Sequence, residues 1–138
     1  MNKHSVDDLK QMQALPLGNK IATKGNTIMK KAMLSQPMAG KTNEEIVATR
    51  ERAIATLTAK GYEIINTLFT DEWYGKDAME SRGVVQIPLC FLAKSLENMS
   101  LCHAAYFCKG WENARGCRIE HDAAKAYGLE IIYEEDPV

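Results

Sequence analysis

Short apolar segments that alternate with stretches of helical periodicity constrain the fold of this chain more than any other feature. Strands that alternate with helices along a chain form a parallel sheet, which helices cover on both faces. The sequence therefore predicts a small doubly wound α/β domain with a parallel sheet of four to five strands. The expected strands are KAMLS (31–35), YEIIN (62–66), HAAYFC (103–108) and LEIIYE (129–134).

Capping residues predict the limits of the first helix. Thr42 and Glu45 form a capping box, in which Thr42 is the N-cap and the Glu45 side chain reaches back to it. The helix is expected to run to about Lys60, before Gly61 ends it. Its inner face should carry Ile46, Ala53, Ile54 and Leu57, and its outer face Arg50, Glu51 and Lys60.

Two further helices are predicted at 87–99, with Pro88 in the first turn, and at 114–127, which ends at Gly128. Residues 67–86 read as a long polar and aromatic connection, and connections of that length are usually functional or mobile. Residues 1–28 read as an N-terminal appendage, a short helix followed by a flexible linker, to which the sequence assigns no role. Residues 29–138 form the α/β domain.

The balance of charges bears on the partners of the chain. Its 138 residues include 17 basic and 18 acidic side chains, which gives a net charge of −1. Nucleic acids and anionic membranes select basic surfaces, so we expect neither as a partner. No apolar run approaches the ~18 residues of a membrane span, and no signal peptide is recognisable, so we expect a cytoplasmic protein.

The cysteines and histidines show no metal-binding pattern. The cysteines are spaced too irregularly for a zinc ribbon and read as reduced, mostly buried thiols. We therefore expect no metal and no cofactor. The residues concerned are Cys90, Cys102, Cys108, Cys117, His4, His103 and His121.

The triplet Gly40-Lys41-Thr42 matches the end of a phosphate-binding P-loop, but the rest of that motif is missing. The motif G-x-x-x-x-G-K-[ST] requires a first glycine where this chain has Ser35, and Pro37 removes an amide that would face phosphate. The sequence thus argues against a nucleotide hydrolase. The loop still precedes a helix N-terminus, where amides can hold an anion or a sugar hydroxyl.

A helix over 114–127 places Glu120 in the middle of a stripe that faces the sheet or a cleft. An acid at such a position must be paired or must line a pocket. It is either a structural glutamate, paired with Arg115, Arg118 or a backbone amide, or a functional carboxylate that acts as nucleophile or general acid/base toward an acetal-like carbon. The remaining members of the stripe are Gly116, Cys117, Ala123, Ala124 and Tyr127.

Three segments closely resemble a family of short bacterial and phage proteins of unassigned function. They are MLSQPMAGKTNEEI (33–46), GYEIINTLF (61–69) and YFCKGWENARGCRIEHDAAKAYGLEIIY (106–133). That family is similar to the nucleoside 2-deoxyribosyltransferases and the related deoxynucleotide N-glycosidases. The resemblance covers roughly residues 30–134.

The resemblance implies a Rossmann-like fold that usually forms homo-oligomers, and a nucleoside or nucleotide as the small-molecule substrate. It implies that Glu120, four residues after Gly116, attacks C1′ of the deoxyribose to form a glycosyl-enzyme, which a second base or water resolves. The loop Ser35, Gln36, Pro37 and Met38 matches the sugar-binding loop of these enzymes. Ligands of parallel sheets bind outside the carboxyl ends of the strands, so the loop after the third strand and the start of the last helix supply further candidate substrate-binding residues: Gly110, Trp111, Glu112, Asn113 and Gly116.

Three positions depart from the pattern of these enzymes. Ala114 stands where the transferases have a sugar-binding aspartate, Ser95 roughly where an acid protonates the leaving base, and His103 where an aspartate often opens the third strand. The function expected is therefore an N-glycosidase or deoxyribosyltransferase-like enzyme. The alternative is a non-catalytic module of the same fold that binds a nucleotide or another small ligand.

Several loop residues allow two interpretations. Trp111 can stack on a nucleobase, or it can cover the core or contact another subunit. Trp73 and Tyr74 are ligand contacts or interface residues, Asn113 is better explained as a helix N-cap than as a substrate ligand, and His103 reads as an ordinary strand-edge histidine.

Overall fold

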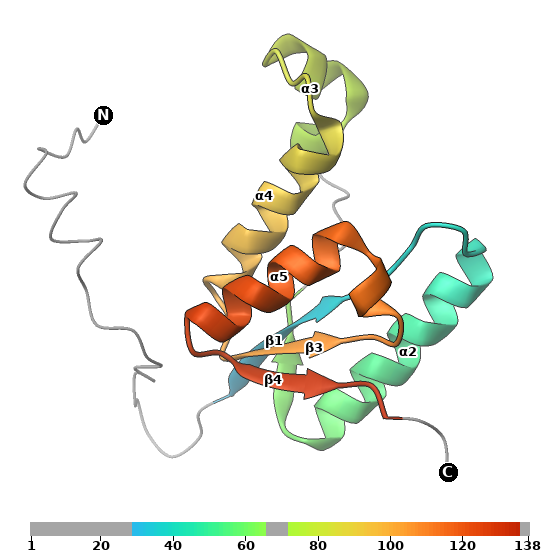
Figure 1. Cartoon of the computed structure of the whole chain (residues 1–138), viewed down its shortest axis with the longest axis vertical. Helices are drawn as coiled ribbons and strands as arrows, with labels where there is room; N and C mark the ends of the chain where they lie inside the picture. The colour runs from blue at the N-terminus through green and yellow to red at the C-terminus, as the bar shows by residue number, and fades with distance from the viewer. Residues whose placement is uncertain (1–28, 66–71, 136–138) are drawn as a thin grey trace, which may run out of the picture.

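The computed structural model describes residues 29–65 and 72–135 and has one four-stranded sheet (Figure 1). The strand order is β2-β1-β3-β4, and every pair is parallel. This confirms the predicted α/β class. The predictions for residues 1–28 and 66–71 lie outside the described residues. The strands are β1 (Lys30–Ser35), β2 (Tyr62–Ile64), β3 (Ala104–Phe107) and β4 (Glu130–Tyr133), and the helices are α2 (Asn43–Ala59), η1 (Glu72–Tyr74), α3 (Lys76–Ser81), α4 (Ile87–Met99), η2 (Trp111–Asn113) and α5 (Arg115–Ala126).

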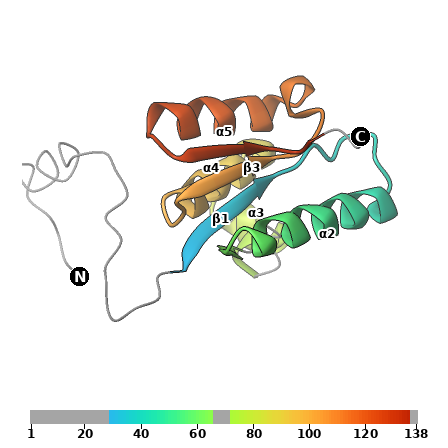
Figure 2. The same ribbon diagram turned by 90° about the horizontal axis from the view of Figure 1, so that it is seen from below.

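Helices cover both faces of the sheet, as Figure 2 shows from its edge, with α2 on one face and α4 and α5 on the other. Each face has its own apolar cluster. Under α2, Leu34 and Tyr106 pack with Ala53 and Leu57. On the other face, Met33, Phe107 and Ala124 share a core. Alternate residues of a strand point to opposite faces, so Ser35, two residues after Met33, belongs to the face covered by α5.

The start of α2 follows from local chemistry. The Thr42 hydroxyl accepts a hydrogen bond from the Glu45 amide at 3.1 Å, which confirms Thr42 as the N-cap. The Glu45 side chain does not reach the Thr42 amide as a capping box requires. It accepts instead from the Thr42 hydroxyl, at 3.3 Å. Gly61 follows the helix with φ of 89°, as expected for a residue that ends a helix in the left-handed region.

Four expectations from the sequence are wrong. The connection 67–86 contains the short helices η1 and α3. Asn113 caps nothing, because Ala114 is the N-cap of α5 and has no side-chain capping bond. Tyr127 is 63% exposed, because α5 ends at Ala126 and the chain turns away from the stripe. Arg50 is half-buried rather than on the outer face, and burial lowers the pKa of its guanidinium.

No helix of the described ranges is both long and apolar enough to cross a membrane.

Candidate functional site

The candidate site lies at the carboxyl edge of the sheet, where β1 and β3 end side by side. Ser35 pairs with Phe107, and the Cys108 amide donates to the Ser35 carbonyl oxygen at 2.9 Å. Both Ser35 and Phe107 are buried. In open parallel sheets, ligands bind outside this edge, so the loops that follow Ser35 and Phe107 are the natural walls of a site.

These two loops contact one another. A Cβ atom at Gly110 would lie 3.8 Å from Cγ of Pro37, so the loop after β3 packs on the loop after β1. Gly110 has φ of 87°, a left-handed conformation that other residues rarely adopt. The Gln36 side chain donates to the Ile46 carbonyl oxygen at 2.7 Å and fixes the first loop to α2. The loops are thus held by backbone geometry and by side-chain bonds, since the Lys109 amide of the second loop donates to Glu134 Oε1 at 2.8 Å.

Glu120 is buried on the inner face of α5, with 8% of its surface exposed. Cys117 and Ala124, one turn before and one turn after it, are buried on the same side of the helix. Burial raises the pKa of the Glu120 carboxyl group to about 7, and the neighbouring Ser35 hydroxyl opposes that rise. At neutral pH the carboxyl group therefore exists in both protonation states, as a group that exchanges protons or attacks as an anion requires.

The Ser35 hydroxyl is the polar group that β1 presents to Glu120. Its Oγ atom is buried and has no hydrogen bond of normal geometry within the described part of the chain. Ser35 and Glu120 are therefore polar neighbours that form no hydrogen bond of normal geometry. A buried hydroxyl without a partner costs about 1–3 kcal/mol, and the rest of the strand from Ala32 to Leu34 is apolar. A serine at this position needs an explanation other than packing.

Cys117 is the third member of this cluster, which consists of Ser35, Cys117 and Glu120. Burial raises the pKa of its thiol, which the Ser35 hydroxyl opposes and the Glu120 carboxylate reinforces. The sequence placed Cys117 on the stripe only as a small side chain. Its spacing of three residues before Glu120 on a helix was the signal that it shares the surroundings of the carboxyl group.

The structural alternative for Glu120, an ion pair with a nearby arginine, is not found among the described residues. Arg118 instead donates to the Glu112 carbonyl oxygen at 3.3 Å, on the outer side of the helix start. Among residues 29–65 and 72–135, the ion pairs are Arg52–Glu134 and Lys94–Glu97. Glu120 thus stands beside neutral groups.

Trp111 packs within the protein. Its ring stacks on His121 with 4.0 Å between centroids, and it lies 5.6 Å from Phe107 and 5.9 Å from Tyr133. His121 and Tyr133 are joined by a 2.7 Å hydrogen bond between Nε2 and the hydroxyl group. Trp111, a half-buried residue, therefore covers the edge of the core beside Phe107.

The other residues expected in the site are dispersed. Met38 is 46% exposed. Glu112 and Asn113 are exposed in η2, and Gly116 is half-buried in the first turn of α5. The structure thus brings Ser35 to Glu120, and Pro37 to Gly110, but it places no polar side chain of η2 against the carboxyl group. No group of three potential metal ligands occurs in the described part of the chain.

The three departures from the enzyme pattern have separate environments. His103 lies at the opposite, amino edge of the sheet, where its Nδ1 accepts a hydrogen bond from the Lys31 amide at 2.9 Å. This supports its interpretation as a strand-edge histidine. Ser95 lies within α4, and Ala114 precedes the first turn of α5 without a polar side chain.

The region that contains these strands and Glu120 is also the region that matches a known family. A family model described as "Domain of unknown function (DUF4406)" matches residues 30–133. The chain belongs to this family. No curated protein matches the chain, and no solved structure matches it either. The DUF4406 domain extends from the start of β1 to the end of β4, so the sheet and the Ser35–Cys117–Glu120 cluster lie wholly inside it.

Proposed function

We propose that this DUF4406 protein cleaves or exchanges the bond between a nucleobase and C1′ of a ribose or deoxyribose, with Glu120 as the nucleophile. The observation that supports this most is the state of Glu120. It is a buried carboxyl group with a pKa of about 7, beside a neutral hydroxyl at the ligand-binding edge of the sheet. A carboxyl group held only for stability is normally paired with a cation.

The chemistry requires the anionic form of Glu120. One carboxylate oxygen attacks C1′, the C1′–N bond breaks, and its electron pair leaves with the base, which takes up a proton. A glycosyl ester of Glu120 results. Water then adds its oxygen to C1′ and releases a proton to solvent, and Glu120 leaves as the carboxylate. In the transferase variant, a nitrogen of a second base replaces the water.

Ser35 is suited to assist the departure of Glu120 in the second step. Its unpaired hydroxyl can donate to the carboxylate that re-forms when the ester breaks, a charge that is otherwise poorly solvated in the buried site. This chemistry requires the sugar ring to reach the carboxyl group of Glu120, a residue that is 8% exposed and lies between the buried side chains of Cys117 and Ala124. The loop 35–38 supplies the second wall in this proposal.

A second candidate function is a non-catalytic module that binds a nucleotide or a related small ligand. The observation that favours it is the absence of acids at the positions that assist catalysis in the similar enzymes. Ala114 carries no polar side chain, and His103 is engaged with the Lys31 amide at the far edge of the sheet. In that case the protein binds its ligand without turnover.

Base release separates the two candidates. The protein is incubated with the four common deoxynucleosides, the four ribonucleosides and their 5′-monophosphates, and free base is measured by chromatography. If the protein is an enzyme, at least one substrate releases base, and this release is lost in Glu120→Gln. Circular dichroism of the variant checks that it still folds. If no substrate releases base, but one raises the melting temperature of both proteins, the binding module is correct.

A further inference from the structure

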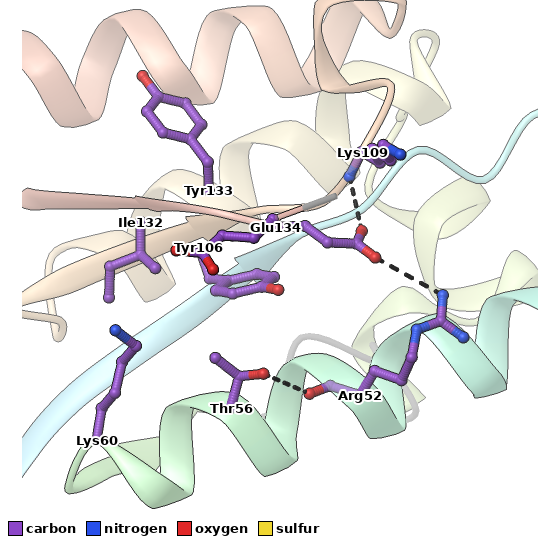
Figure 3. Close-up of a pocket in the computed structure, with 9 residues that line it drawn as sticks. Arg52, Thr56, Lys60, Tyr106, Lys109, Ile132, Tyr133 and Glu134 are labelled. Carbon is purple, nitrogen blue, oxygen red and sulfur yellow. Dashed lines mark hydrogen bonds and ion pairs between the residues drawn. The ribbon is translucent and has the colours of Figure 1, made fainter. Parts of the chain in front are cut away.

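A hollow of about 460 Å³ lies on the α2 face of the sheet, opposite to the face that carries Glu120 (Figure 3). We name it the α2 basin. One wall is a single stripe of α2, Arg52, Thr56 and Lys60, which are spaced four residues apart and so lie above one another on the helix. The opposite wall of the basin is formed by the sheet, through Tyr106 of β3 and Ile132 of β4.

The basin exists because of the way α2 is placed. This helix packs chiefly over β2 and β1, so it leaves the α2 face of β3 and of the edge strand β4 partly open. The open part is large enough for a small molecule, since ligand pockets have volumes of roughly 300–1,000 Å³. Its position at the end of β4 gives it an entrance from solvent.

The charges around the basin favour an anion. It is lined by three cationic side chains, Arg52, Lys60 and Lys109, and by two carboxylates, Glu134 and Glu135. Glu134 is already engaged, because Oε1 accepts from the Lys109 amide at 2.8 Å and Oε2 lies 3.7 Å from the Arg52 guanidinium. Lys60, in contrast, has no ion-pair partner within the described ranges, and Figure 3 shows its ammonium group directed toward Ile132.

The side of the basin formed by the sheet favours a flat, partly apolar group. Tyr106 is 3% exposed and Ile132 is half-buried, so both are held in place by packing. The Tyr106 phenol is protonated at neutral pH, as any tyrosine is, and burial, with a contribution from the nearby Glu134 carboxylate, raises its pKa further, to about 12. The Thr56 hydroxyl beside it donates to the Arg52 carbonyl oxygen at 3.0 Å and also lies against the Tyr106 hydroxyl.

We propose that the α2 basin is a second ligand site, which binds a small organic anion that carries a flat ring. The ring packs on Tyr106 and Ile132, and the anionic group is held by Lys60, since Arg52 is directed toward Glu134 at the other end of the basin. Lys60 is also the C-cap of α2, where a cation is favourable for the helix itself. This favourable position explains why residue 60 is a cation, but it does not explain the basin that Lys60 lines.

Isothermal titration calorimetry of the full chain with 1-naphthyl phosphate tests the proposal, because this probe combines one ring system with one anionic group. We expect saturable binding at one site, at least tenfold weaker for 1-naphthol and for inorganic phosphate. Lys60→Gln should weaken binding of 1-naphthyl phosphate at least fivefold. Lys125→Gln, which removes an exposed lysine from the last turn of α5 on the other face of the sheet, should leave it unchanged.

Three results would overturn the second site. The first is the absence of saturable heat up to millimolar probe, and the second is an equal loss in Lys60→Gln and Lys125→Gln, which would indicate attraction by net charge alone. The third is loss of binding in Glu120→Gln, which would place the probe on the α5 face. An unchanged affinity in Glu120→Gln supports a separate site whether or not the protein releases base, so this test is independent of the proposed function.

Discussion

Glu120 of α5 faces the hydroxyl group of Ser35 at the end of β1, on the side of the sheet that α4 and α5 cover. The chain brings the two together because the strand order places β1 beside β3 and α5 crosses over β3. A carboxyl group and a hydroxyl group, both buried and without a cation, form a poor structural pair. The free energy of unfolding of the protein should therefore depend on pH through the titration of Glu120.

The first prediction concerns Glu120→Gln and stability against pH. The pKa of Glu120 rises from 4.5, its ordinary value, to about 7 in the folded protein. Between these values the unfolded chain loses this proton while the folded chain keeps it, so folding becomes less favourable as pH rises. Once the pH is above both pKa values, the free energy of unfolding has fallen by about 3 kcal/mol. Glu120→Gln should unfold at higher urea concentration than the native protein at pH 8.

The same comparison below pH 4.5 is its internal control. There both states of the native protein are protonated at Glu120, so the advantage of Glu120→Gln in the free energy of unfolding should vanish. If the variant is less stable than the native protein at pH 8, Glu120 is a structural anion with a partner, and the raised pKa is wrong.

The second prediction concerns Ser35→Ala. The Ser35 hydroxyl opposes the effect of burial on the pKa of Glu120, so its removal should raise that pKa further. Carbon-13 NMR of labelled glutamate side chains measures the titration directly. Ser95→Ala, which removes a serine from α4, should leave the midpoint of Glu120 unchanged. An unchanged midpoint in Ser35→Ala would show that the two groups do not interact.

The third prediction separates two glycines of the site region. Gly110→Ala should destabilise the protein by about 1–2 kcal/mol, because φ of 87° is strained for alanine. The cost is conformational, since the new methyl group would meet Pro37 only at 3.8 Å, an ordinary contact. Gly116→Ala, in a helix with open space around it, should be neutral or stabilising by up to about 1 kcal/mol. Equal losses in the two variants would contradict this account of the loop.

The fourth prediction concerns the start of α2. Thr42→Ala removes the acceptor of the 3.1 Å bond from the Glu45 amide, and should lower the free energy of unfolding by about 1 kcal/mol. Glu45→Ala should have a smaller effect, about 0.5 kcal/mol or less, because its contact with Thr42 is exposed. Chemical denaturation of both variants checks the order, and a larger loss in Glu45→Ala would show that the carboxylate carries the cap.

Most of the fold could be predicted from the sequence, because its determinants are local. Parallel strands buried on both faces read as apolar runs, which identified all four strands. Gly61 and Gly128 have positive φ and end the helices where their sequence positions indicated. Asn113 failed as a predicted N-cap because η2 takes up Trp111–Asn113 and leaves Ala114 as the cap. Residue preferences cannot anticipate such a tertiary constraint.

The site could be predicted only in part. Helical periodicity placed Glu120 on the inner face of α5, and the rule for parallel sheets placed it near the loop after β1. Arg115 and Arg118 lie five and two residues before Glu120 and so point to another side of the helix, whereas a partner from another segment depends on distances that no local pattern encodes. The same holds for Trp111, whose partners His121 and Tyr133 come from α5 and β4. The α2 basin could not be predicted from the sequence, because it arises from the position of a helix over the sheet.

The most direct test of Glu120 as a nucleophile is a search for its glycosyl ester. The protein is mixed with a substrate that releases base, quenched in acid within the first turnover and digested, and the peptide that contains Glu120 is examined by mass spectrometry. The account predicts a mass increase equal to one sugar residue on Glu120, and its absence in Glu120→Gln. Base release by a protein in which this peptide stays unmodified, and release undiminished in Glu120→Gln, would contradict it.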